Sequence, residues 1–236
     1  MSVADKLKTI AEKQQEVYDA GYAKGLAQGG DSTYFWEVFQ NGGQRTSYGY
    51  AFYQWDGAIF NPKYDIRPTG QYGADSMFFG ATNIDDLDAL LNSKGIVLDF
   101  SNTSRLNSTF QRCSASKLPV INLTNCKNMT LSFQNMSYLT KLTLNNLSAD
   151  CTFDRVFVGT NLTELDITGT IGQNGFDVSS CRLSADSIND ILIDNLQDKS
   201  GDTSGTEWKI TLGSTNKNKA SATALADAEA KGWVIV

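Results

Sequence analysis

Residues 118–128 read LPVINLTNCKN, a run of alternating apolar side chains followed by small polar residues and a cysteine. The apolar residues follow the spacing L-x-x-L-x-L, and this spacing occurs three times along the chain. The nine positions are Leu118, Ile121, Leu123, Leu139, Leu142, Leu144, Leu162, Leu165 and Ile167. When the strand-like segments at Leu98, Ile121, Leu142 and Leu165 are aligned, they start 23, 21 and 23 residues apart. Such a period predicts one short strand in each repeat, with alternate side chains pointing inward.

A single repeat of this length cannot bury its apolar face alone, so neighbouring repeats must stack. The sequence therefore predicts an α+β protein whose main part, residues 64–236, is an irregular leucine-rich-repeat solenoid with short parallel strands and a C-terminal capping helix.

An aromatic residue recurs between the predicted strands, at Phe79, Phe110, Phe133 and Phe157. After two of them the chain reads FQRCSASKL and FQNMSYL, which share the form F-x-x-C/M-S followed by leucine. We expect these rings to fill the convex side of the repeats, beside a short helix or 3₁₀ turn.

The combined pattern F-x-x-C-…-L-x-x-I-x-L resembles the BspA-type leucine-rich repeats of bacterial surface proteins and bacteriophage structural proteins. The resemblance covers about residues 64–236, and it implies the same solenoid fold. The stretch that begins WEVFQNGGQRTSYGYAF resembles a segment of phage repeat proteins that lies between a coiled coil and a solenoid.

Residues 1–28 form the first predicted domain, an anchor helix. Its a/d-type positions are Val3, Leu7, Ile10, Gln14 and Val17. Spacings of three and four at these positions are typical of a coiled coil, and a polar residue at Gln14 would set register and oligomeric state. We expect a homo-oligomer, with a trimer favoured. The alternative is one amphipathic helix packed on its own domain.

Residues 29–63 form the second predicted domain, an aromatic-rich junction. Between residues 34 and 60 lie ten aromatic side chains, from Tyr34 to Phe60. They suit either a solenoid N-cap or a platform on which sugar rings stack.

In the third domain, residues 64–236, a helical insertion is expected near 184–196. A loop at 197–207, a capping helix over 220–233 and a closing strand follow it.

The chain offers few groups for catalysis. It has no histidine, and its four cysteines, at 113, 126, 151 and 181, form no C-x-x-C pair. Cys126 aligns with Thr103 and Leu147, which predicts a turn marker and not a metal or redox ligand. The acid pair Asp85–Asp86 fits a helix start, and the pair Asp186–Asp190, like the first, has no histidine, arginine or metal-ligand set beside it in the sequence. We therefore predict no enzymatic activity, no cofactor and no metal, while two carboxylates suffice for a glycosidase and keep that alternative open.

Charge and hydropathy bear on partners and location. The net charge is −6 with a pI of about 4.7, so we expect no nucleic acid partner. The chain shows no apolar run long enough to span a membrane and no signal-peptide pattern.

The predicted function is that of a bacteriophage virion component, a tail, baseplate or head fibre. It would be made in the host cytoplasm, assemble with other virion proteins and attach to a bacterial surface receptor, a glycan or a protein. The alternatives are a bacterial adhesin and a carbohydrate-active enzyme.

Overall fold

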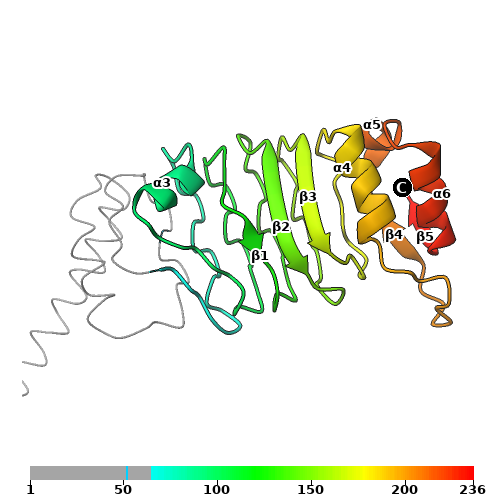
Figure 1. Ribbon diagram of the computed structural model, residues 1–236, viewed down its shortest axis with the longest axis horizontal. Coiled ribbons are helices and arrows are strands. Elements are labelled where there is room, and N and C mark those ends of the chain that lie inside the picture. The colour runs from blue at the N-terminus through cyan, green and yellow to red at the C-terminus, as the bar shows by residue number, and fades with distance from the viewer. Residues whose placement is uncertain (1–51, 53–64) are drawn as a thin grey trace, which may run out of the picture.

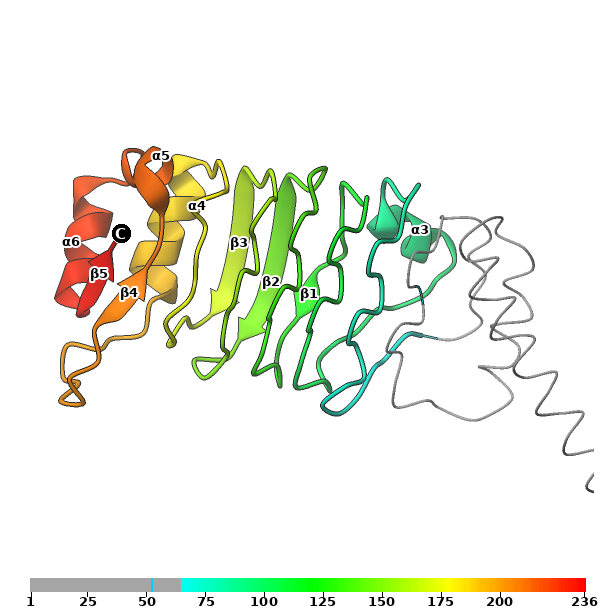
Figure 2. The same cartoon turned by 180° about the vertical axis from the view of Figure 1, so that it is seen from behind.

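The computed structural model describes Phe52 and residues 65–236, which form an elongated stack of chain segments (Figures 1 and 2). The anchor residues Val3, Leu7, Ile10, Gln14 and Val17 lie outside the described residues, as does the aromatic junction except for Phe52. The elements are α3 (Leu87–Ser93), β1 (Ile121–Asn122), β2 (Lys141–Leu147), β3 (Glu164–Gly169), α4 (Ala185–Asp190), η1 (Ile191–Asn195), β4 (Trp208–Ile210), α5 (Gly213–Lys217), α6 (Ala222–Ala230) and β5 (Trp233–Ile235).

Neighbouring segments, the rungs of the stack, run parallel to one another. Strands β1, β2 and β3 form one parallel sheet in that order, and β4 pairs with β5 in a second. Isolated parallel bridges, such as Ile66 with Leu98 and Arg105 with Asn128, link rungs where no strand is formed. In Figure 1 the rungs follow one another along the long axis in chain order.

The register between rungs differs from the predicted alignment. Ile121 pairs with Leu144, and Leu144 pairs with Ile167, so each step is 23 residues. The alignment had placed Ile121 opposite Leu142. Because side chains alternate with a period of two, a two-residue slip keeps the same face inward, and the apolar pattern cannot choose between the registers. In the observed register Leu118 falls outside the fully buried set and is only partly buried against the core.

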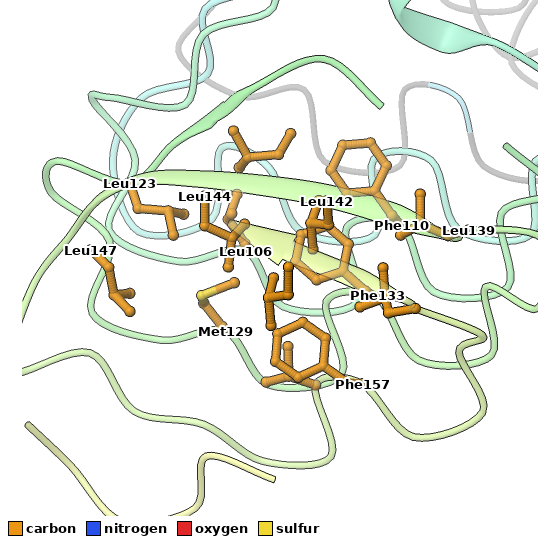
Figure 3. Close-up of a cluster of buried hydrophobic side chains, with 14 of the residues drawn as sticks. Leu106, Phe110, Leu123, Met129, Phe133, Leu139, Leu142, Leu144, Leu147 and Phe157 are labelled. Carbon is orange, nitrogen blue, oxygen red and sulfur yellow. The ribbon is translucent and has the colours of Figure 1, made fainter. Parts of the chain in front are cut away.

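A column of phenylalanine rings runs through the stack. Phe52, Phe78, Phe110, Phe133 and Phe157 stack in succession, with centroid distances of 4.6, 5.3, 5.6 and 6.1 Å and interplanar angles of 4–6°. Figure 3 shows the last three among the buried leucines. The ring in the second rung is Phe78 and not Phe79, because the first of the two adjacent phenylalanines points inward and is fully buried. The column ends where Phe176 meets Phe157 at 69°.

Each rung turns at this column without a helix. From Phe78 to Phe157, the residues two before and two after each stacked ring have positive φ: Ser76 and Gly80, Ser108 and Arg112, Leu131 and Asn135, and Arg155 and Gly159. The backbone N–H of the ring residue donates to the next rung, as from Phe110 to the Ser132 carbonyl at 2.8 Å. The expected short helix or 3₁₀ turn is replaced by this repeated left-handed corner.

Helices gather toward the C-terminal end. Ser184 caps α4 by accepting a hydrogen bond from Ser187 N at 3.2 Å, and the helix continues as the π-helical η1 to Asn195. Ser221 caps α6, and Gly232 follows that helix with φ of 84°, a conformation that favours glycine after a helix end. Strand β5 then pairs with β4 near the end of the chain.

Candidate binding surface

The outward side chains of β1, β2 and β3 form a polar surface, which we call the sheet face. The inward side chains of the same strands, such as Leu142, Leu144 and Leu165, are buried. The sheet face consists of Asn122, Lys141, Thr143, Asn145, Glu164, Asp166 and Thr168. Because the strands are parallel and about 4.8 Å apart, side chains from successive rungs lie beside one another. The fold therefore fixes their spacing.

One end of the sheet face is charged. Lys141 Nζ lies 2.7 Å from Glu164 Oε2 and 3.7 Å from Asp166 Oδ2. The hydrogen bond that Lys141 donates to Glu164 raises the pKa of the Lys141 ammonium, and the charges of Glu164 and Asp166 act in the same direction. All three side chains are more than half exposed, so their mutual attraction adds little to stability and they remain open to a ligand.

The other end carries amides and hydroxyls that bond to one another. Asn122 Oδ1 accepts from Thr124 Oγ1 at 2.7 Å and from Asn146 Nδ2 at 3.2 Å. The register of β2 with β3 shifts between Leu144 and Leu147, where Asn146 has φ of 59°. This irregularity directs Asn146 N toward Thr168 Oγ1 at 3.0 Å. The bonds hold the polar groups in fixed orientations, as recognition of a polar ligand requires.

Next to these residues the surface becomes apolar. Val97 and Val120 are 48% and 51% exposed. Val120 directly precedes β1, and in the register of β1 with β2 it falls opposite Thr143.

The first predicted acid pair lies at the start of α3, and the second spans α4 from its first turn to its last residue. Asp86 caps α3 by accepting from Ala89 N at 2.7 Å, and Lys117 Nζ lies 3.1 Å from its second oxygen. Asp85 instead accepts from Ser116 Oγ at 2.6 Å. Asp186 stands in the first turn of α4, and Asp190 directly precedes η1. The structure therefore gives Asp86 a capping role and brings neither pair to the sheet face.

All four cysteines are buried free thiols. Thr103, Cys126 and Cys151 each donate their backbone N–H to the carbonyl three residues earlier. The side chains of Thr103 and Cys126 both donate to the carbonyl two residues later, at 3.2 and 3.4 Å. Cys151, and not Leu147 as the alignment had it, thus follows Cys126 in this column. A hydrogen bond with Cys126, together with burial, raises the pKa of the Cys151 thiol.

The two outer cysteines are also held in the thiol form. Burial raises the pKa of Cys113 and of Cys181 to about 11. Among the residues that the structure describes, no three acidic, cysteine or histidine side chains converge to hold a metal ion.

The repeat pattern does not identify the sheet face, because it is defined by its apolar positions and assigns no role to the residues between them. The signal that identifies them is the polar residue at every second position of each strand, once the 23-residue register is known.

The chain matches no family model, no curated protein and no solved structure. Within Phe52 and residues 65–236, no helix has the length and apolar character needed to cross a membrane.

Proposed function

We propose that this chain is a non-enzymatic structural protein of a bacteriophage virion, a tail, baseplate or head fibre, that attaches the particle to a bacterial surface. Its main part is a leucine-rich-repeat solenoid that presents the sheet face. The observation that carries the proposal is this face, a row of exposed and half-buried polar side chains held in register by parallel rungs.

In this proposal residues 1–28 join several copies through the heptad positions Val3, Leu7, Ile10, Gln14 and Val17. Several modest sites on one particle then bind together, and their combined affinity greatly exceeds that of one site. Light scattering on the full chain and on residues 32–236 tests this part. We expect an oligomer from the full chain and a monomer from the shorter one, and two monomers would contradict it.

Binding of the purified full chain to intact cells of candidate bacterial hosts tests attachment. We expect the double variant Lys141→Ala/Glu164→Ala to bind cells about tenfold more weakly, since two charged partners of the receptor are lost. The matched control is Lys94→Ala/Glu229→Ala, which removes the same charges from exposed positions away from the sheet face. Equal binding by both variants would contradict a role for the sheet face.

A further inference from the structure

A separate hollow lies beside the loop between η1 and β4. In Figures 1 and 2 this loop projects past the neighbouring rungs. The hollow is shallow and largely open to solvent, and it has a volume of about 730 Å³. It is lined by Asp198, Lys199, Ser200, Gly201, Asp202, Ser204, Thr206 and Trp208.

One wall of the hollow is the indole of Trp208. Its ring packs against Trp233 with centroids 6.0 Å apart, and its Nε1 donates to Asp202 Oδ2 at 2.6 Å. Trp233 is almost fully buried and donates from Nε1 to the Gln197 carbonyl at 2.7 Å. The Trp208 ring is therefore held firmly, with the Lys199 ammonium 3.9 Å from its centroid.

The remaining lining consists of carboxylates and hydroxyls held by the loop itself. Ser200 N donates to Asp198 Oδ1, and Ser204 N donates to Asp202 Oδ1, both at 2.9 Å. Hydrogen bonds from Ser200 lower the pKa of Asp198, and those from Ser204 and Trp208 lower the pKa of Asp202. Both groups are hydrogen-bond acceptors at neutral pH.

The base of the loop is also fixed. Lys199 N donates to the Lys231 carbonyl at 2.7 Å, which ties the loop to the end of α6. The sequence predicts a loop at 197–207, and its two Asp-x-Ser triplets, at 198–200 and 202–204, are typical of hydrogen-bonded turns.

From this lining we infer that the hollow binds a neutral pyranose unit of a surface polysaccharide. A pyranose has an apolar C–H face that packs on an indole, and its neighbouring hydroxyls donate to carboxylates. The lining places an indole, two carboxylates and three hydroxyl side chains around one space. Lys199 offsets part of the acidic charge, so a neutral ligand fits better than a strongly charged one.

Because the Lys199 ammonium lies 3.9 Å from the centroid of the Trp208 ring, a sugar that packs on this face of the indole must displace it. The displaced ammonium then becomes a donor to a sugar oxygen. This inference names a ligand class for the proposed attachment function, and its biological role rests on that function. Binding of free sugars is nevertheless measurable without cells.

Saturation-transfer NMR on the full chain tests the inference with four probes at millimolar concentration: the methyl glycosides of glucose, galactose, mannose and N-acetylglucosamine. We expect at least one probe to bind. Asp198→Ala should weaken that binding about tenfold, the factor expected for loss of a charge-assisted hydrogen bond. Asp198 also accepts from Ser200 N in an exposed turn, so the melting temperature should fall only slightly, because Trp208 is held by Asp202 and Trp233. Asp194→Ala, an exposed acid outside the hollow, is the matched control and should bind normally.

Three outcomes would overturn the inference. They are no transfer to any probe, equal binding by Asp198→Ala and the unaltered chain, and binding abolished by EDTA, which would indicate a bridging cation. If the sugars fail while cells still bind, the hollow is not a sugar site but the attachment function stands. If sugars bind while cells do not, attachment fails independently of the hollow.

Discussion

At the scale of single residues, the left-handed corners have the most direct energetic consequence. Leu131 and Arg155 hold φ of 58° and 51° at the same place in successive rungs, two residues before a stacked phenylalanine. A residue with a Cβ loses about 1–2 kcal/mol in this conformation. At Phe78, Phe110 and Phe133 the fold tolerates the loss because the corner aligns the backbone N–H of the ring residue with a carbonyl of the next rung.

Arg155→Gly should therefore stabilise the protein. The exposed ion pair with Asp154 contributes little, while relief of the left-handed strain should raise the free energy of unfolding by up to about 1 kcal/mol. Urea denaturation followed by circular dichroism measures it. Arg155→Ala is the matched control, because it removes the same side chain but keeps a Cβ, and it should bring no gain. A gain of equal size in both variants would assign the effect to the side chain and not to the backbone.

Gly159, at the other side of that corner, supplies the opposite case. A Cβ there would lie 2.3 Å from Asn135 Oδ1, and φ is 74°. Gly159→Ala should destabilise the protein chiefly because alanine rarely adopts this φ, while the Asn135 side chain must also shift to make room.

At the scale of elements, α3 depends on one carboxylate for its start. The backbone N–H of Ala89 and the ammonium of Lys117 lower the pKa of Asp86. Since the folded pKa lies below the unfolded value, the stabilisation is present above about pH 4 and is lost as the pH falls through the folded pKa.

Replacements of Asp86 separate the cap from the charge. Asp86→Ala should cost about 1 kcal/mol at pH 7, the usual value of an N-cap. Asp86→Asn keeps a capping oxygen and should cost less at that pH. Its difference from the unaltered chain should shrink between pH 5 and pH 2, because only aspartate is protonated there. Chemical denaturation across this range measures the trend, and a difference that stays constant with pH would contradict it.

The sequence located elements better than it located their mutual register. Caps such as Ser184 and Asp86 could be predicted because their signals are local, a short polar side chain before an apolar periodic run. The register of Ile121 could not be predicted, because slips of two residues leave the same apolar face inward. The choice of Phe78 over Phe79 depends on contacts with Phe52 and Phe110, from distant parts of the chain. The hollow beside Trp208 could not be predicted either. The loop that lines it is held to the end of α6 by a backbone hydrogen bond, which no spacing in the sequence indicates.

At the scale of the whole molecule, each described rung is stabilised by its neighbours. The ring column and the interlocking backbone bonds connect Phe52 to Phe157 without interruption. In a linear stack of this kind, loss of a terminal unit exposes the next one and lowers the stability of the rest. Phe52 is the member of this column that precedes residues 65–236 in the sequence, and its ring stacks on Phe78.

Two shortened chains test this dependence. Residues 32–236 retain Phe52, whereas residues 65–236 lack it, so the Phe78 ring loses a neighbour at 4.6 Å and the Met77 carbonyl loses a donor at 2.7 Å. We expect the shorter chain to lose at least about 2–3 kcal/mol of unfolding free energy, the value of one buried phenylalanine.

The full-length variant Phe52→Ala isolates the ring from the other residues removed, and it should reproduce most of this loss. Urea denaturation of the three proteins beside the full chain gives the comparison. Equal stability of residues 65–236 and 32–236 would show that the stack ends at Phe78. A large loss on truncation with none in Phe52→Ala would assign the stabilisation to residues 32–64 other than Phe52. The expected order is full chain, then residues 32–236, both above Phe52→Ala and residues 65–236, because the ring column transmits the loss of its end member to every rung that follows.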